Sequence, residues 1–503
     1  MPDLARRGLP ILALMLAAHP FLAVTIPPAT DLPQHVAQVG LLGEALAGRA
    51  PELAVNWIAP GNLGYAAVAL AGAVLPPFAA GRVALMLVVL AGVAAAWIVA
   101  ERRGRPIGAV VLAAALAFNH SLYWGFLPFL AGWPVFLAWV HAVSPASPRP
   151  VTARRTALLA GLGLLLYASH ALWLAAGVAW VTLETVRRPP AGGGIAARAA
   201  ALLPAAALAA LWYPAMAAAR AEGGFDVDAH WFTTPLARLD PRWLADAMLG
   251  GIRGPVEAVV AAGVAAWVAL GLRTRRRDLR EACDGPLVAA GLLLVAVALL
   301  GPDKYLNTLE FGGRWFPIGV SLLLLGLPAP AVREWLAGAA AAALLAALSA
   351  STTLAWMRFE HEDLSGLAGA IEAVPAGSRV LGLDMVKQSD VVKGRPFVQA
   401  PAWVEPVRGA RPAFSFAEHS TGLVTRTDTR APPWTANLEW AAEHVKPSDF
   451  GYFDHVIVNG ADAVHAGAAA SRELEPVTTT GRWRLYRVVS NGMRSKSPHR
   501  PNR

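Results

Sequence analysis

The sequence predicts a polytopic α-helical membrane protein of about eleven spans, followed by a C-terminal extracytoplasmic α/β domain. Hydrophobic residues make up 56% of the 503 positions and charged residues only 15%, whereas soluble domains carry about 25% charged residues. Apolar runs recur over residues 1–357, and charges of both signs become frequent from Arg358 onward. Lipid is therefore the expected solvent for the first of these two parts.

Eleven apolar segments approach the roughly 20 residues that a helix needs to cross a bilayer. They lie at residues 9–26, 82–100, 107–120, 126–142, 156–170, 171–186, 195–216, 254–272, 285–301, 314–330 and 335–357. Arg6 and Arg7 precede the first segment as in a signal sequence, but no small-x-small cleavage site follows, so we expect an uncleaved span. Residues 63–78, which two prolines interrupt, are expected to form a re-entrant or interfacial segment.

Arginine clusters between the apolar segments indicate the topology. The clusters are Arg6/Arg7, Arg102/Arg103/Arg105, Arg149/Arg154/Arg155, Arg187/Arg188, Arg273/Arg275/Arg276/Arg277/Arg280 and Arg333. If the eleven segments alternate across the membrane, all clusters fall on one side, which the positive-inside rule identifies as the cytoplasm. We therefore expect a multi-pass inner (plasma) membrane protein with a cytoplasmic N-terminus. The clusters form no continuous basic face, so no nucleic-acid partner is expected.

The part after Met357 has the pattern of a small α/β domain over residues 358–490. Short strand-like runs occur at residues 379–383, 455–458 and 483–489, with helical pieces at residues 363–373 and 438–444 between them. The basic tail 491–503 has almost no apolar residue and is expected to be disordered. Cys283 is the single cysteine, so no internal disulfide and no cysteine metal centre is expected.

The segment that follows the first span carries Asp31, Gln34 and His35, with apolar residues at helical spacing after them. The spacing predicts an amphipathic helix along the outer membrane surface. Asp31 is a favoured N-cap, and Gln34 at the third position resembles a capping box. Alternatively, Asp31 and His35 share one helical face, where the carboxylate can take a proton from an acceptor hydroxyl at the membrane boundary.

Further polar residues are expected at the outer boundary. Asn119 and His120 open the motif Asn-His-Ser-Leu-Tyr-Trp-Gly-Phe-Leu, and His170 lies between two apolar runs. Interfacial anchoring explains the aromatic residues of this motif, but it does not explain the asparagine and the histidine. These three residues are candidates for lining a polar pocket, although a histidine between two helices, such as His170, is more often a satisfied turn residue than a ligand.

Two outer loops carry candidate ligands for a phosphate and for a metal ion. Asp303, Lys304 and Arg314 concentrate charge between two apolar segments, where the cations suit a lipid phosphate. Interfacial snorkelling or internal pairing with Asp303 or Glu310 is the alternative. The second loop contains Asp226, Asp228 and His230, whose oxygen and nitrogen donors suit a divalent cation. A solvated polar loop has the same composition.

These motifs resemble the C-type (GT-C) membrane glycosyltransferases, which are relatives of the protein O-mannosyltransferases and of bacterial glycosyltransferase 39-like proteins. The resemblance rests on Asp31 just past the first span, on Asn119 with Gly125-Phe126-Leu127, on Tyr167 to His170, on Phe311 to Trp315 and on the C-terminal α/β pattern. It implies transfer of a sugar from a polyprenyl-phosphate-linked donor to an extracytoplasmic acceptor. It also implies that Asp31 is the general base.

Two other functions remain open. A transporter usually carries ionisable residues at mid-membrane depth, and the predicted spans are nearly free of them. A non-catalytic scaffold of envelope or polysaccharide assembly would use the outer domain to bind a partner or a glycan. Leu32 favours the scaffold, because the better-defined GT-C subfamilies carry a second acidic residue there.

Overall fold

A computed structural model describes residues 3–145, 152–189, 194–222, 226–418, 422–428 and 433–489 of the chain. Each of the eleven predicted apolar segments contains a helix. These are α1 (Asp3–Ala23), α4 (Pro77–Arg102), α5 (Ile107–Ala115), α7 (Leu127–Val143), α8 (Ala153–Ser169), α9 (Ala171–Arg187), α10 (Gly194–Glu222), α12 (Val256–Thr274), α14 (Gly285–Leu300), α15 (Phe316–Gly326) and α16 (Glu334–Arg358). The predicted disordered tail lies outside the described residues.

Five helical stretches within the described residues are long and apolar enough to cross a membrane. They are Pro77–Arg102, Ile107–Trp124, Gly194–Ala218, Val256–Thr274 and Glu334–Asp363. The chain is therefore an integral membrane protein, and the count of eleven spans remains a prediction. The interrupted stretch 63–78 contains α3 (Asn62–Gly72), whose 11 residues are too few to span a bilayer.

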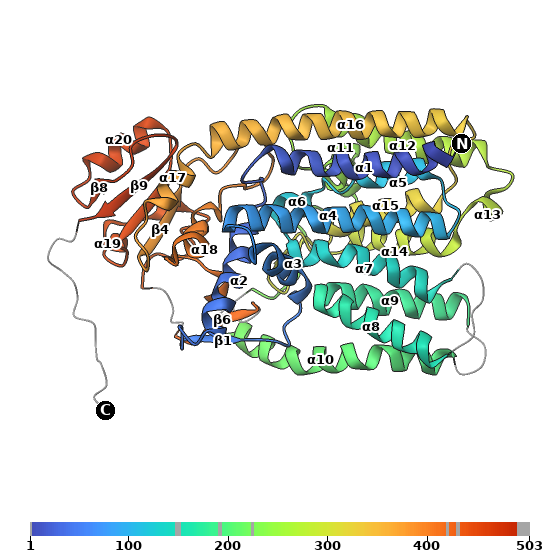
Figure 1. Cartoon of the computed structure of the whole chain (residues 1–503), viewed down its shortest axis with the longest axis horizontal. Coiled ribbons are helices and arrows are strands. Elements are labelled where there is room, and N and C mark those ends of the chain that lie inside the picture. Colours follow the sequence, from blue (N-terminus) through green and yellow to red (C-terminus); the bar gives the residue numbers. More distant parts are fainter. Residues whose placement is uncertain are drawn as a thin grey trace.

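The long helices run side by side, and the N-terminus lies far from the sheet, whereas α16 ends beside it (Figure 1). Helix α1 packs against α16, α4 and α5. The N-terminus and the short helix α13 (Leu279–Ala282) lie at one end of the bundle, and the C-terminal elements lie at the other end (Figure 1). This arrangement is the one expected if the arginine-rich connections face one side of the membrane.

The C-terminal part contains a five-stranded sheet in the order β5-β4-β7-β9-β8. Its strands are β4 (Arg379–Asp384), β5 (Arg411–Pro412), β7 (His455–Asn459), β8 (Leu474–Pro476) and β9 (Trp483–Val488), and its helices include α17 (Leu367–Glu372), α18 (Val404–Arg408), α19 (Pro447–Phe450) and α20 (Asp462–Ala470). Strand β4 is parallel to both neighbours, whereas β9 is antiparallel to β7 and β8. The three strand-like runs of the sequence thus form β4, β7 and β9.

The prediction of a helix at residues 438–444 is wrong. Only a single 3-10 turn forms there, at Ala442–His444. Asn437 precedes it with a φ of 60°, a left-handed conformation that a continuous right-handed helix excludes. The local pattern was apolar at helical spacing, but the chain turns at this residue instead.

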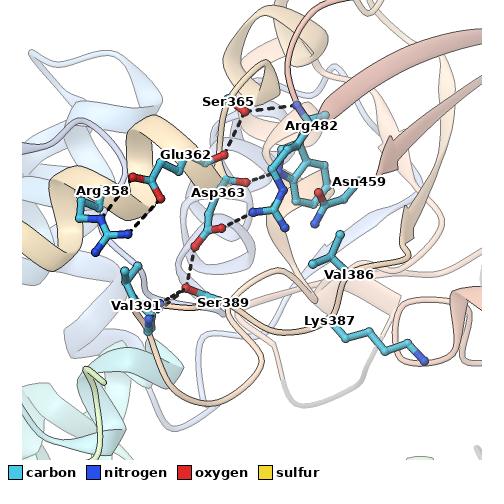
Figure 2. A network of polar contacts seen from close by, with 12 residues as sticks. Arg358, Glu362, Asp363, Ser365, Val386, Lys387, Ser389, Val391, Asn459 and Arg482 are labelled. Carbon is cyan, nitrogen blue, oxygen red and sulfur yellow. Dashed lines mark hydrogen bonds and ion pairs between the residues drawn. The ribbon is translucent and has the colours of Figure 1, made fainter. Parts of the chain in front are cut away.

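The sheet is fixed to the end of α16 through Asp363. Helix α16 continues into a π-helical turn, Phe359–Asp363. The Asp363 carboxylate accepts a hydrogen bond from the Ser389 hydroxyl at 2.6 Å and forms an ion pair with Arg482, as Figure 2 shows. The Trp483 indole donates to the Asp363 carbonyl at 2.9 Å. Because these groups lie on three separate segments, the last membrane helix and the sheet are held in one orientation.

Helix α2 (Leu32–Leu46) is buried over its first half, from Leu32 to Gln38, and is more exposed after that. C-terminal segments cover its first two turns. Gln34 and Gln38 are fully buried there, and both side chains form hydrogen bonds with these segments. The Gln38 amide bonds both the N–H and the carbonyl of Val424, at 2.8 and 3.1 Å. Strand β1 (Leu53–Val55) also pairs with β6 (Val424–Arg426). Distant residues therefore cover the first two turns, and the location of this helix along the membrane surface stays a prediction.

Candidate active site

Asp31 lies at the start of α2 but does not cap it. Its φ and ψ of −87° and −2° are helical, and its side chain makes no cap hydrogen bond. The Gln34 side chain does not complete a capping box, since its oxygen accepts from the Phe416 N–H at 2.9 Å and its amide donates to Gln399 at 2.8 Å. The capping interpretation of both residues is therefore wrong. The Asp31 carboxylate is left available for another role.

The backbone of Asp31 is held by the turn that follows α6 (His120–Trp124). The Asp31 N–H donates to the Trp124 carbonyl at 2.9 Å, and the Thr30 N–H donates to the Tyr123 carbonyl at 3.0 Å. Gly125 ends α6 with a φ of 73°. A Cβ on Gly125 would lie 2.9 Å from the Asp31 nitrogen, so only glycine fits here without displacement. The Gly-Phe-Leu motif thus packs directly against the segment that joins α1 to α2.

Arg314 lies next to this turn, on two aromatic rings. It belongs to the short turn Gly313–Trp315 before α15. Its guanidinium carbon is 4.2 Å from the Phe126 ring centroid and 4.9 Å from that of Phe129, and only 4% of the residue is exposed. Its Nε donates to the Glu310 carbonyl at 3.1 Å. Burial lowers the pKa of Arg314 to about 10, so the group remains a cation at neutral pH.

Asp31 and Arg314 interact electrostatically. Burial raises the pKa of the Asp31 carboxyl to about 7, while the positive charge of Arg314 opposes this rise. A carboxyl with this pKa exists in both protonation states at neutral pH, which is the condition for efficient proton transfer in either direction. The negative charge of Asp31, added to burial, raises the pKa of Tyr65 well above its usual value.

His35 lies beneath Asp31 as a neutral imidazole. Burial lowers the pKa of His35 to about 3. The ring lies 5.6 Å from the Tyr65 ring and 5.6 Å from the Phe416 ring, measured between centroids. Its Nδ1 is buried and has no hydrogen-bond partner among the described residues. A neutral nitrogen of this kind is a ready hydrogen-bonding position for a substrate hydroxyl.

His120 and Asn119 differ in their exposure. The His120 Nε2 accepts from the Trp124 indole at 2.8 Å, and its Nδ1 lies 3.8 Å from the Glu310 carboxylate. Its side chain is 30% exposed, so it can contact a bound molecule. Asn119 is the N-cap of α6, accepting from the Ser121 N–H at 2.9 Å and donating to the Leu116 carbonyl at 2.7 Å. Its amide is therefore engaged in the local turn.

His170 also has a local structural role. It caps α9, because its Nδ1 accepts from the Leu172 N–H at 3.2 Å. Its ring centroid lies 6.1 Å from that of Phe129. Burial and then the charge of Arg314 lower the pKa of His170 to about 3. His170 is therefore a neutral turn residue that lies close enough to Arg314 to interact with its charge.

The remaining predicted residues form a second, separate polar cluster. Lys304 pairs with the Asp226 carboxylate at 2.9 Å, and the same oxygen lies 2.8 Å from the His230 Nε2. Asp303 pairs at 2.9 Å with Arg238, a fully buried residue that sequence reasoning missed. Internal pairing, rather than an open phosphate site, thus describes Asp303 and Lys304. Only Arg314 of the predicted phosphate-binding residues joins Asp31.

The divalent-cation site predicted at Asp226, Asp228 and His230 gains no support from this arrangement. The hydrogen bond from Lys304, with further bonds from His230 and the Asp228 backbone, lowers the pKa of Asp226. No group of three or more His, Cys, Asp or Glu side chains within the described part of the chain is placed to hold a metal ion. The site stays a prediction, which transfer assays with and without a chelator would check.

Comparison with known proteins gives structural matches only. No family model and no curated protein matches the chain. Among solved structures, the arabinofuranosyltransferase AftD from Mycobacteria matches at 16% identity and a TM-score of 0.49 over 97% of this chain, which spans 40% of the length of AftD. ArnT from Cupriavidus metallidurans matches in the apo state (11% identity, TM-score 0.43, 95% of this chain and 96% of ArnT). It also matches when bound to undecaprenyl phosphate (13% identity, TM-score 0.46, 97% and 98%).

AftD and ArnT are GT-C glycosyltransferases, the class that the sequence motifs resemble. At these TM-scores and identities, the likeness assigns neither a function nor a residue role to this chain.

Proposed function

We propose that this protein is a membrane glycosyltransferase that transfers a sugar from a polyprenyl-phosphate-linked donor to an extracytoplasmic acceptor. The observation that carries the proposal is that one turn, Gly125-Phe126, contacts both Asp31, a carboxyl of raised pKa, and the buried Arg314 guanidinium, which interact electrostatically. The reaction needs a base for the acceptor hydroxyl and a cation for the leaving phosphate. Both are present in one group of side chains at the end of the helical bundle.

In the proposed step, the acceptor oxygen attacks the anomeric carbon of the sugar. The bond between that carbon and the phosphate oxygen breaks, and its electron pair leaves with the lipid phosphate. Asp31 takes the hydroxyl proton and later releases it to solvent, while Arg314 stabilises the charge that develops on the phosphate. The neutral imidazole of His35 offers a hydrogen bond to a sugar or acceptor hydroxyl.

The surroundings of Arg314 suit an amphipathic donor. The Phe126 and Phe129 rings beneath the guanidinium exclude water from one of its faces. Phe129 and Asn119 also line an apolar cavity of about 40 Å³ between α4, α5, α7 and α15. A lipid phosphate held by Arg314 would therefore have apolar protein surface next to its first carbon atoms.

The test is sugar transfer by the purified protein in proteoliposomes that contain a labelled polyprenyl-phosphate-linked sugar. Wild type is expected to transfer label to an acceptor fraction, and Asp31→Asn to lose at least ~100-fold of the rate. A matched variant, Asp462→Asn, changes a carboxyl on α20 that is 94% exposed and is expected to keep the rate. Unchanged transfer by Asp31→Asn would remove Asp31 from the role. If no form of the protein transfers sugar, while residues of the C-terminal part prove essential, the non-catalytic scaffold is favoured instead.

We also propose that the sheet-containing end is extracytoplasmic. Cys283 lies at the opposite end, directly after α13, and is partly exposed. A membrane-impermeant maleimide is expected to label Cys283 only after cells are permeabilised. In a Cys283→Ser background, Asp462→Cys replaces a side chain that is 94% exposed and is expected to react in intact cells. The reverse labelling pattern would invert the topology.

A further inference from the structure

A second cavity lies away from Asp31 and Arg314, where three membrane helices end. It has a volume of about 550 Å³ and opens to the surface. Its lining includes Thr25, Phe78, Met357, Glu360, His361 and Ser365. None of the residues grouped around Asp31 belongs to it. The proposed transferase step leaves this cavity unused.

The position of the cavity corresponds to the headgroup layer of the bilayer. Helix α1 ends at Ala23, α4 begins at Pro77 and α16 ends at Arg358, and these ends lie together at the sheet-containing end of the bundle (Figure 1). Apolar and polar residues therefore meet in the cavity wall, with Phe78 and Met357 beside the charged turn of residues 359–363. Such a wall suits an amphipathic molecule rather than a fully polar one.

Glu360 gives the cavity a fixed negative charge. Its Oε1 accepts from the Thr25 N–H at 2.8 Å and from the Ile26 N–H at 3.0 Å. Its neighbours Glu362 and Asp363 pair with Arg358 and Arg482 (Figure 2). Within the described residues, no cationic side chain pairs with Glu360. The carboxylate is thus held in place by the backbone, while Arg82, the cation bound to the neighbouring Val24 carbonyl, forms no ion pair with it.

We infer that this cavity binds the headgroup of an amine-bearing phospholipid, of the phosphatidylethanolamine class. The ammonium group pairs with Glu360, and the exposed His361 imidazole at the cavity wall donates to a phosphate oxygen. The acyl chains continue along Phe78 and Met357 toward the lipid-facing surface of the helices. An anionic headgroup such as phosphatidylglycerol brings no cation and meets the charge of Glu360 instead. The inference does not rest on the proposed transferase activity.

Native mass spectrometry of the purified full chain tests the inference, using phosphatidylethanolamine and phosphatidylglycerol with identical acyl chains at equal concentration. Wild type is expected to retain phosphatidylethanolamine about fivefold better, the size of one partly exposed ion pair. Glu360→Gln keeps an oxygen acceptor for the Thr25 and Ile26 N–H groups but removes the charge, so the preference is expected to disappear. Glu362→Gln, outside the cavity lining, is the matched control and is expected to keep it.

Equal retention of both lipids by wild type, or a preference that survives in Glu360→Gln, would overturn the inference. A second variant reaches the cavity from its other wall. Gly369 lines the cavity and a Cβ there meets no atom within 4 Å, so Gly369→Phe adds a ring at the cavity wall and leaves the Glu360 carboxylate in the sequence. Loss of phosphatidylethanolamine from this variant is expected, and full retention would contradict a headgroup site even if Glu360→Gln failed to fold.

Discussion

The α-carbon of Gly125 lies so close to Asp31 that a Cβ at position 125 would be 2.9 Å from the Asp31 backbone nitrogen. Two hydrogen bonds, from Thr30 and Asp31 to the carbonyls of Tyr123 and Trp124, fix this contact. The glycine therefore sets where the segment between α1 and α2 places the Asp31 carboxylate. Its neighbour Phe126 sets where Arg314 lies. One turn thus positions both groups of the proposed reaction.

Gly125→Ala is expected to displace Asp31 and reduce sugar transfer by on the order of 100-fold, because small misplacements of a reacting group are costly. The positive φ of 73° adds a stability loss of about 1–2 kcal/mol. Gly40→Ala is the control, since its Cβ meets no atom within 4 Å on α2. It is expected to keep full transfer. Equal activity of both variants would show that the contact does not position Asp31.

Gln38→Leu is expected to lower the free energy of unfolding by about 2 kcal/mol or more. The substitution leaves the N–H and the carbonyl of Val424 without the amide that bonds them in the buried interface. The melting temperature of the purified protein in detergent measures the effect. Glu44→Ala, at the exposed end of the same helix, removes only a surface pair with Arg49 and should leave the melting temperature nearly unchanged. Similar values for the two variants would contradict a stabilising role for the Gln38 amide.

Arg314→Lys is expected to weaken binding of a short polyprenyl phosphate by about tenfold. Lysine keeps the charge but loses the fork geometry and the stacking on Phe126. Lys304→Met is expected to change this binding less than about twofold, because Lys304 pairs with Asp226. Isothermal titration of both variants distinguishes the two cations. A larger loss for Lys304→Met would place the phosphate in the second cluster.

Asp31→Asn is expected to stabilise the protein above neutral pH. The pKa of Asp31 is about 7 in the folded chain, and that of an unfolded aspartate is about 3.9. The folded protein therefore keeps a proton that the unfolded chain releases between these values, so wild-type stability falls as pH rises toward 7 and then levels off. The variant lacks this fall. Melting temperatures of both proteins at pH 5 and pH 8 check this expectation. A melting temperature at pH 8 that is higher for wild type than for Asp31→Asn would contradict it.

The helices and strands were largely predictable because they depend on local patterns. Hydropathy located all eleven apolar helices, and alternation located β4, β7 and β9. The Asp31–Gln34 spacing misled for the same reason, since it is a local capping pattern. Gln34 instead bonds Gln399 and Phe416, which lie too far along the chain for any spacing argument to reach.

The candidate site was predictable in its residues but not in its grouping. Asp31, His35, His120, His170 and Arg314 were all identified, and electrostatic interactions join them in the structure. Lys304 and Asp303 were assigned to the same site, yet they belong to the cluster with Asp226 and Arg238. Phe126 comes directly after Gly125 in the sequence. This aromatic residue was the one sequence feature that could have indicated where the Arg314 guanidinium lies.

The dependence of sugar transfer on pH tests the central claim most directly, because it reports the ionisation of the proposed base. Only the deprotonated Asp31 can accept the hydroxyl proton, so the wild-type rate is expected to rise about tenfold per pH unit below 7 and to level off above about 7. Asp31→Asn is expected to be slow and to lack this rise. A variant with the wild-type rate, or with the same rise near pH 7, would contradict the role of Asp31 as the general base.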